Sequence, residues 1–260
     1  MITAGIDMGA KTIKVVIMED GKKVLSMAKD LGGTDTRATT EKIYADALKK
    51  ASVKMEDITH VTSTGTGRAA APYAKDNITE VGAAAKGVIF IYPSARTVID
   101  VGAEEGKTLR CDATGKVIDF AVNEKCAAGA GSFMESMARA LEVKLEELGP
   151  LALKSTNAIP MNAQCAVFAE SEVVTLVHQK TPKQDIAKAI HDAIADRITS
   201  MVRKVGFEKD VVIIGGVAKN PAFVEAMKRN LEMDMIVANE PEFVGAIGAA
   251  IMAVENAGVK

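Results

Sequence analysis

Gly5-Ile-Asp-Met-Gly-Ala10 lies at the start of the chain, and nearly the same stretch returns 93 residues later as Val98-Ile-Asp-Val-Gly-Ala103. In both places the stretch ends an apolar run, and a polar turn and a second apolar run follow it. A repeat at this spacing indicates two similar α/β halves, although chance similarity is the alternative. Because each copy puts an aspartate and a glycine at a hairpin bend, facing halves would place Asp7 and Asp100 on opposite sides of one cleft.

The composition limits the classes of protein to which the chain can belong. Its 260 residues suffice for one large domain or two of ordinary size, and the 48% of hydrophobic residues can fill a substantial core. The formal net charge of -2, the aromatic content of 4% and the absence of tryptophan argue against nucleic acid as a partner. No apolar stretch is long enough to cross a bilayer, so no membrane partner is expected. The chain opens on a strand pattern rather than on a leader, and we expect a cytoplasmic protein.

Outward from the repeat, the hydrophobic pattern predicts strands and helices in both halves. Val211-Val-Ile-Ile-Gly215-Gly216 has the pattern of a buried strand that breaks into a Gly-Gly turn, and Pro221 starts the helix after it, a position that proline favours. We expect a first half over residues 1–96, completed by a C-terminal helix within 242–260, and a second half over 97–241. The other predicted elements are strands at 3–9, 12–18, 23–27 and 58–63 and helices at about 40–51, 78–89 and 184–206.

A glycine-rich stretch around a cysteine, Asn123-Glu-Lys-Cys-Ala-Ala-Gly-Ala-Gly131, stands before the next helical pattern. Backbone N–H groups at a helix start favour a thiolate or a metal–sulfur cluster there, whereas the alternative is a buried cysteine beside a tight turn or a phosphate loop. Cys165 likewise precedes a helical pattern, while Cys111 ends a hairpin strand and is predicted to lie in the core. An odd number of widely spaced cysteines, with no Cys-x-x-Cys pair, favours neither disulfides nor a zinc site.

The two Asp-x-Gly bends and the Gly-Gly turn together suit a nucleotide. Hairpin bends offer backbone N–H groups to phosphates, and aspartates hold Mg²⁺ directly or through water. In order and spacing these segments resemble the superfamily of actin, heat-shock and sugar-kinase ATPases over nearly the whole chain. The similar segments are Gly5 to Lys14 for its first phosphate loop, Val98 to Lys107 for the second and Ile213 to Asn220 for the adenosine loop. The resemblance implies an α/β fold of two duplicated actin-like, ribonuclease H-like ATPase halves around a nucleotide cleft that binds ATP and Mg²⁺.

Within that superfamily, the cysteine segments resemble the iron–sulfur ATPases that drive electrons into acyl-CoA-reducing enzymes. The similarity is greatest to the D-type ATPase subunits of ATP-dependent benzoyl-CoA reductase, through Val101-Gly-Ala-Glu-Glu-Gly106 and Asp119-Phe-Ala-Val-Asn-Glu-Lys-Cys126. This implies ATP hydrolysis coupled to low-potential electron transfer, for the reductive dearomatisation of an aromatic acyl-CoA. The alternative within the family is a homodimeric activator of a 2-hydroxyacyl-CoA dehydratase, in which Gly-Gly-Gln-Asp is usual in place of Gly102-Ala-Glu-Glu105.

The same resemblance assigns roles to individual residues. A [4Fe–4S] cluster would be bound by Cys126 and Cys165 and shared with a second ATPase subunit, because the cluster needs four cysteines and one chain supplies two at matching positions. That subunit is expected to be related but non-identical, and the other expected partners are catalytic acyl-CoA reductase subunits and a ferredoxin electron donor. Catalytic roles fall to Asp7, Asp100 and Glu170, although Glu170 could equally lie on an exposed helix face. The residues implied to bind the nucleotide are Gly9, Ala10, Lys11, Thr12, Gly102, Ala103, Glu104, Gly215, Gly216, Lys219 and Asn220.

Two other classes of function remain open on the sequence. A small-molecule kinase of the same fold would need a phosphoryl-acceptor site with a catalytic base, and it would give no role to Cys126 and Cys165. A filament-forming or regulatory ATPase would likewise have no use for a metal–sulfur cluster. The iron content of protein purified without oxygen would separate these classes from the electron-activating ATPase.

Overall fold

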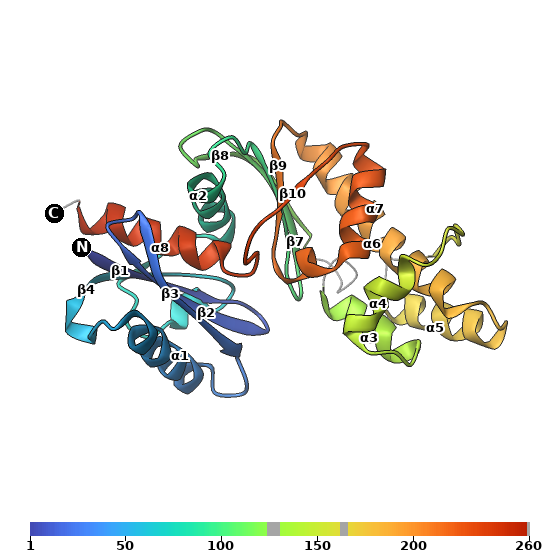
Figure 1. The fold of residues 1–260 in the computed structure, drawn as a ribbon, viewed down its shortest axis with the longest axis horizontal. Coiled ribbons are helices and arrows are strands. Elements are labelled where there is room, and N and C mark those ends of the chain that lie inside the picture. The colour runs from blue at the N-terminus through green and yellow to red at the C-terminus, as the bar shows by residue number, and fades with distance from the viewer. Residues whose placement is uncertain (124–130, 162–165, 259–260) are drawn as a thin grey trace. The chain divides into compact units, whose positions relative to one another are not determined.

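The computed structural model describes residues 1–123, 131–161 and 166–258. The chain divides into two compact units (Figure 1). The first comprises Met1–Val98, Cys111–Ile118 and Glu242–Lys260, and the second comprises Ile99–Arg110 and Asp119–Pro241. The boundaries of the two halves at 96/97 and 241/242 stay a prediction. None of the described helices combines the length and the apolarity that a membrane-spanning segment needs.

The first unit is built on a five-stranded sheet with the order β3-β2-β1-β4-β5. Its first three strands form an antiparallel meander, and β4 and β5 add to it in parallel. Residues 20–22 connect β2 to β3, and Asp20 and Gly21 have the positive φ angles, 52° and 65°, that the two central residues of a type I′ turn require. The strand bounds are Ile2–Met8 for β1, Thr12–Glu19 for β2, Lys23–Leu31 for β3, Ile58–Thr64 for β4 and Asp76–Asn77 for β5. The strands predicted in this region are thus confirmed.

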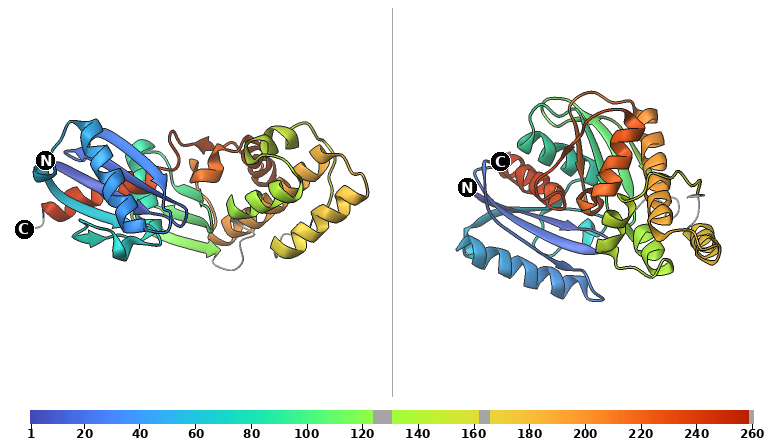
Figure 2. Two further views of the ribbon diagram at one scale, coloured as in Figure 1. Left: turned by 90° about the horizontal axis from the view of Figure 1, so that it is seen from below. Right: turned by 45° about the vertical axis from the view of Figure 1, so that its right-hand side comes forward.

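The first unit has the helices α1 (Thr36–Ala51) and α8 (Val244–Ala257) on its sheet, and α2 (Glu80–Ile91) lies against α8 (Figures 1 and 2). Helix α1 packs on β2 and β3, whereas α8 packs on β1, β2 and β4 and also on α2. Short 3-10 turns, Met55–Asp57 and Arg68–Ala70, precede and follow β4. The C-terminal segment therefore completes the core of the first unit.

Helix α8 approaches its neighbours at backbone distance because glycines line the contacts. A Cβ atom at Gly5 on β1 would lie closer than 3.0 Å to the carbonyl oxygen of Ala246, and one at Gly248 would lie equally close to that of Ala83 on α2. Real Cβ atoms do not make such contacts with backbone. The small-residue pattern of α8 is thus a packing requirement of the first unit.

The second sheet has the order β10-β9-β6-β7-β8, which repeats the first sheet strand by strand. The central strand β6 is equivalent to β1, its hairpin strands β7 and β8 to β2 and β3, and β9 and β10 to β4 and β5. The bounds are Thr97–Val101 for β6, Gly106–Cys111 for β7, Val117–Asn123 for β8, Val211–Ile214 for β9 and Ile236–Val237 for β10. Identical strand order in two sheets confirms the duplication that the repeated Ile-Asp-x-Gly-Ala predicts.

The second unit differs from the first in the helices between its meander and β9. Residues Phe133, Met137 and Ile190 from these helices are fully buried in one core, together with Phe223 from α7. The short helix α4 was not predicted, because Gly149 and Pro150 within it are helix-breaking residues. The helix bounds are Gly131–Ala140 for α3, Leu145–Ala152 for α4, Ala166–His178 for α5, Lys183–Val205 for α6 and Pro221–Leu231 for α7.

We expect Gly248→Ala to destabilise the protein by about 3 kcal/mol, because the added methyl group collides with the carbonyl of Ala83. The higher helix propensity of alanine offsets only about 1 kcal/mol of this cost. Gly258→Ala at the end of the same helix is the control, since a Cβ there lies at an ordinary 3.7 Å from its nearest neighbours. Urea unfolding of both variants checks the prediction, and equal midpoints would contradict it.

Candidate functional site

The first candidate site lies where the hairpin of β1 and β2 turns, at residues 7–14. Asp7 stands at the end of β1, and Lys14 is its register partner on β2. The Lys14 ammonium donates to Asp7 Oδ2 at 3.0 Å, with 12% and 14% of the two side chains exposed. A carboxylate and an ammonium held this close and mostly shielded from water form a pre-positioned charge pair at the bend.

Gly65, directly after β4, holds the chain against Asp7. Its φ of +93° lies in the left-handed region, and a Cβ atom there would stand 2.6 Å from Asp7 Oδ1 and closer still to the carbonyl oxygen of Met8. The backbone N–H of Gly67 donates to that same carbonyl at 2.9 Å. The turn after β4 thus packs directly against Asp7 and Met8 at the end of β1, and only glycine fits at position 65.

The second unit repeats this arrangement around Asp100, at the end of β6. Gly215, directly after β9, has a φ of +87°, and a Cβ atom there would stand 2.6 Å from Asp100 Oδ1 and closer still to the carbonyl oxygen of Val101. Within the hairpin that follows, Lys107 Nζ lies 3.0 Å from Glu105 Oε2. Each aspartate of the sequence repeat is therefore in contact with a left-handed glycine from the neighbouring strand.

The start of α3 is hydrogen-bonded to the second hairpin. The backbone N–H of Gly131 donates to the carbonyl of Gly102 at 2.9 Å. The backbone N–H of Ser132 donates to the carbonyl of Ala103 at 2.8 Å, and the Ser132 hydroxyl donates to the same oxygen at 2.7 Å. We call these three bonds the α3 clamp. They place the predicted phosphate residues Gly102 and Ala103 against the helix that follows the Cys126 segment in the chain.

The turn at Gly215 continues into a 3-10 turn, Gly216–Lys219, and then into α7. Asn220 is the N-cap of α7, since its Oδ1 accepts from the backbone N–H groups of Ala222 and Phe223 at 3.1 and 3.3 Å. Its Nδ2 lies 3.9 Å from the sulfur of Met134 on α3. The side chain of Asn220 is therefore engaged in a structural cap, whereas Gly216 and Lys219 are exposed.

The remaining predicted site residues lie apart from these contacts or outside the description. Ala10, Lys11 and Glu104 are exposed at the bends, while Thr12 begins β2 and is partly buried. Glu170 is exposed on α5, which packs on α3 and α6. Cys126 and Cys165 lie outside the described residues, and the part of the chain that is described contains no group of His, Cys, Asp or Glu side chains that could hold a metal ion.

Cys111, the third cysteine, ends β7 and is 1% exposed. Burial raises the pKa of its thiol to about 11. A thiol with this pKa stays protonated at neutral pH, and a protonated thiol is a poor nucleophile and metal ligand. The prediction that Cys111 belongs to the core is confirmed.

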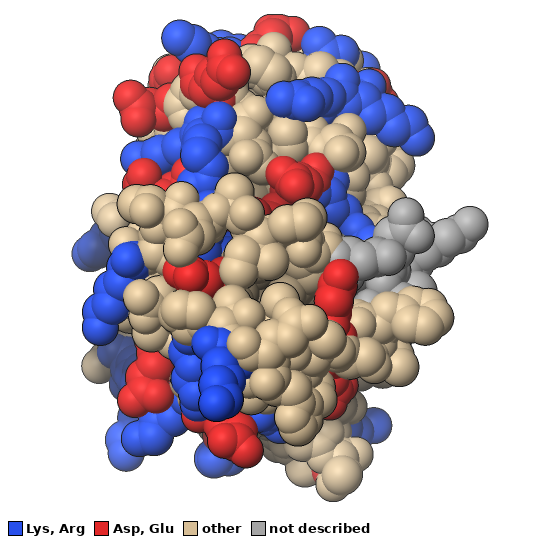
Figure 3. Space-filling view, turned by 90° about the vertical axis from the view of Figure 1, so that its right-hand side faces the viewer, with Lys and Arg blue, Asp and Glu red and all other residues tan. Residues whose placement is uncertain are grey.

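Helix α5 has several large apolar side chains exposed to solvent. Phe168 and Val167 are each 68% exposed in its first turn, and Val174 is 42% exposed two turns later. Figure 3 shows the side of the molecule on which Figure 1 draws α3 to α6. Uncharged side chains cover much of the centre of this view. Exposed apolar side chains that gather on one helix are a common feature of surfaces that bind another protein.

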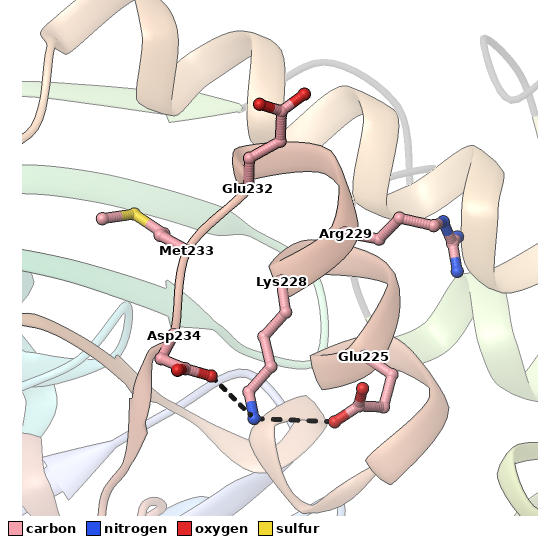
Figure 4. Close-up of a pocket in the computed structure, with 6 residues that line it drawn as sticks. All are labelled: Glu225, Lys228, Arg229, Glu232, Met233 and Asp234. Carbon is pink, nitrogen blue, oxygen red and sulfur yellow. Dashed lines mark ion pairs between the residues drawn. The ribbon is translucent and has the colours of Figure 1, made fainter.

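A surface hollow on α7 offers no comparable chemistry. Six residues line it, and Lys228 lies between two carboxylates, 3.6 Å from Glu225 and 3.7 Å from Asp234 (Figure 4). The side chain of Arg229 points away toward an ion pair with Asp192 (Figure 4). Because none of the predicted site residues lines this hollow, we do not take it as the candidate site.

Four residues of these contacts received no role from the sequence. Lys14 and Lys107 lie at the same position in the two repeats, 93 residues apart. This equivalence could have predicted that the two lysines have similar roles. Gly65 and Ser132 carried no such signal, because their importance comes from what they touch. Ser132 in particular differs from other serines only through its bonds to Ala103.

The duplicated sheets and the two Asp–Gly hairpins define an ATPase of the actin-like class. The chain belongs to the BadF/BadG/BcrA/BcrD ATPase family, whose model matches residues 4–253. The activator of lactoyl-CoA dehydratase from Anaerotignum propionicum is 40% identical over 99% of this chain and 99% of its own. Component A of (R)-2-hydroxyglutaryl-CoA dehydratase from Acidaminococcus fermentans has a solved structure that matches with a TM-score of 0.94, at 36% identity over 99% of both chains. The activator of 2-hydroxyisocaproyl-CoA dehydratase from Clostridium difficile, solved with bound ADPNP, matches with a TM-score of 0.92 at 37% identity, over 99% of this chain and 96% of that one.

The expected closer similarity to benzoyl-CoA reductase does not appear in these comparisons. The matching chain of the benzoyl-CoA reductase from Thauera aromatica is 32% identical over 96% of this chain and 92% of its own. The dehydratase activators named above are 36 to 40% identical. The identities therefore favour the alternative that the sequence left open, the activator, over the main interpretation.

We expect Gly65→Ala to cost at least about 3 kcal/mol of stability, since the new methyl group meets both a carbonyl and the Asp7 carboxylate. Gly33→Ala is the matched control. It has a similar φ of +64°, but the nearest atom to its Cβ position is Thr39 Oγ1 at 3.8 Å, so it should cost only the ~1 kcal/mol of left-handed strain. Thermal or urea unfolding measures both, and equal losses would show that the contact with Asp7 adds nothing.

Proposed function

We propose that this chain is the ATP-hydrolysing activator of a 2-hydroxyacyl-CoA dehydratase and couples ATP hydrolysis to low-potential electron transfer into that enzyme. The observation that carries the proposal is full-length similarity to activators of such dehydratases, at 36 to 40% identity. The duplicated hairpins supply the independent support, because they offer the groups that ATP hydrolysis needs.

The described residues fit a magnesium nucleotide. Asp7 and Asp100 offer carboxylate oxygens, the ligands that Mg²⁺ prefers, and Lys14 offers a cation for phosphate oxygens next to Asp7. When bound, Mg²⁺ neutralises the charge that develops on the transferred phosphoryl group. In this proposal Asp7 and Asp100 would hold the metal, Gly9 and Gly102 would allow the backbone to approach phosphates, and the turn at Gly215 and Gly216 would bind the adenosine.

The iron–sulfur cluster remains part of the proposal. Cys165 directly precedes α5, which begins at Ala166, and Cys126 precedes the start of α3 by five residues. Helix starts favour the anionic charge of a thiolate-bound cluster. Because two cysteines supply half of the usual four ligands, a second chain must supply the rest.

We propose that the second chain is another copy of this one. The exposed Val167 and Phe168 are the second and third residues after Cys165, so a copy bound to the same cluster would cover them. A dimer of identical chains replaces the non-identical pair that the reductase interpretation implied. The other proposed partners are the catalytic dehydratase and a ferredoxin that donates the electron.

The second candidate is the ATPase subunit of a benzoyl-CoA reductase. The segment Val101-Gly-Ala-Glu-Glu-Gly106 favours it, because it resembles the reductase subunits more than the usual Gly-Gly-Gln-Asp of the activators. In that case the partner chain would be non-identical and the substrate an aromatic acyl-CoA.

We expect Asp7→Asn and Asp100→Asn each to lower ATP hydrolysis by at least about 100-fold and to abolish dehydratase activation, because a carboxylate that positions the metal is lost. Asp30→Asn is the control, since Asp30 is an exposed residue paired with Lys42 and should keep full activity. The measurements are phosphate release and 2-hydroxyacyl-CoA dehydration by the dehydratase partner, with ATP and a low-potential reductant.

Two results would contradict this scheme in different ways. Full ATP hydrolysis in both variants would reject the assignment of the aspartates. Wild-type ATP hydrolysis that supports benzoyl-CoA reduction but no dehydration would reject the activator in favour of the second candidate.

For the cluster, we expect Cys126→Ser and Cys165→Ser to lose iron and its absorption while ATP binding survives, because each removes a thiolate ligand. Cys111→Ala should keep the cluster, since Cys111 is buried in the core. Iron and sulfide assays on oxygen-free protein should give about four of each per dimer of the wild type. A value near eight, or an intact cluster in Cys126→Ser, would overturn the shared cluster.

A further inference from the structure

The α3 clamp constrains more than the carbonyl oxygens that it binds. A peptide unit is planar and trans, so its C=O and its N–H point in opposite directions. The carbonyl of Gly102 belongs to the same peptide unit as the N–H of Ala103, and the carbonyl of Ala103 to the same unit as the N–H of Glu104. With both carbonyls held on Gly131 and Ser132, these two N–H groups must point away from α3.

Both N–H groups belong to the bend between β6 and β7. Within the described residues, neither the N–H of Ala103 nor that of Glu104 donates to another backbone group, whereas the N–H of Gly102 donates to Glu105 across the bend at 2.9 Å. Two adjacent N–H groups pointing the same way from a bend form a concave donor site for an anion. The α3 clamp therefore fixes the direction in which the N–H groups of Ala103 and Glu104 point.

Ser132 contributes a second bond that a residue without a hydroxyl group could not make. The carbonyl of Ala103 accepts from both the backbone N–H and the hydroxyl of Ser132, at 2.8 and 2.7 Å, so both of its lone pairs are used. Alanine at position 132 would keep the first bond and lose the second. The peptide unit of Ala103 and Glu104 would then be held by one hydrogen bond instead of two.

On the α3 side of the clamp, the residues after Ser132 are anchored in the core. Phe133 and Met134, which follow Ser132, are buried in the core of the second unit. A Cβ atom at Gly131 would lie 3.5 Å from Val217 Cγ2, in the turn after β9. The start of α3 thus touches both segments of the second unit to which nucleotide binding is assigned.

The first hairpin has no equivalent clamp among the described residues. There the carbonyl of Lys11 accepts from the backbone N–H of Gly32 at 2.9 Å, and the donor comes from the end of β3 rather than from a helix. The duplication therefore does not explain the clamp, which is a feature of the second half alone.

We propose that Ser132 is a positioning residue for the nucleotide, and that phosphate binding at the second hairpin orders the start of α3. The inference rests on the proposed ATP binding. Because coupling between two sites is reciprocal, order in α3 strengthens phosphate binding by the same factor by which the phosphate stabilises α3.

The test compares Ser132→Ala with Ser136→Ala in the full-length protein. Ser136 lies one turn later on the same helix, and its hydroxyl accepts from Arg139 without touching the hairpin. The probe is ADPNP with magnesium, its affinity is measured by calorimetry, and hydrogen exchange of residues 131–137 is followed with and without it.

In the wild type and in Ser136→Ala, the nucleotide should slow exchange at the first turn of α3. In Ser132→Ala the affinity should fall about three- to tenfold, the effect of one lost hydrogen bond, and this protection should shrink. Ser132→Thr, which keeps the hydroxyl, should restore much of both. An unchanged melting temperature without nucleotide would separate positioning from a general loss of stability.

Equal affinity and equal protection in Ser132→Ala and Ser136→Ala would overturn the inference while leaving the proposed function intact. So would equal losses in Ser132→Ala and Ser132→Thr, because they would show that the hydroxyl is not what matters. If the wild type itself does not bind the magnesium nucleotide, the proposed function fails and this inference fails with it.

Discussion

The contact between a left-handed glycine and an aspartate carboxylate, made once in each half, is the constraint on which the proposed site depends. At Gly65 and at Gly215 a Cβ position would stand 2.6 Å from the carboxylate oxygen of Asp7 and Asp100, respectively. Any other residue would have to push the aspartate away or move the turn. Because the glycine comes from the neighbouring parallel strand, the contact fixes the aspartate against the sheet and leaves its direction to the hairpin.

The sequence predicted the part of this constraint that repeats at one spacing. Asp7 and Asp100 recur at an offset of 93 residues together with their hairpins, so they could be recognised as equivalent. The two glycines are 150 residues apart, because helices α3 to α6 lie between β8 and β9 where the first half has only α1 and a short 3-10 turn. Between unlike insertions a single shared glycine gives no detectable pattern, and only the folded sheets show its equivalence.

The choice between activator and reductase subunit illustrates a different limit of sequence reasoning. The short segments around Asp100 and Cys126 are the ones proposed to contact a nucleotide and a cluster, and both kinds of ATPase would need such contacts. The two kinds of ATPase would differ in the surface that binds a partner, for which the exposed start of α5 at Val167 and Phe168 is a candidate. Such a surface is spread over the whole chain, so full-length identity carries more weight here than one motif.

The two halves have diverged most where the proposed functions differ. The first half closes its hairpin with strand backbone, while the second closes it with the start of α3. A hairpin bonded to a strand end can bind phosphate, but it makes no hydrogen bond to the start of a helix, so phosphate binding there does not act on a helix. A hairpin bonded to Gly131 and Ser132 shares its hydrogen bonds with a helix whose start is five residues from Cys126 in the chain. If that cysteine binds the proposed cluster, the α3 clamp connects the phosphate-binding hairpin to the helix next to the cluster. Both ends of this connection then belong to the second half of the duplicated fold.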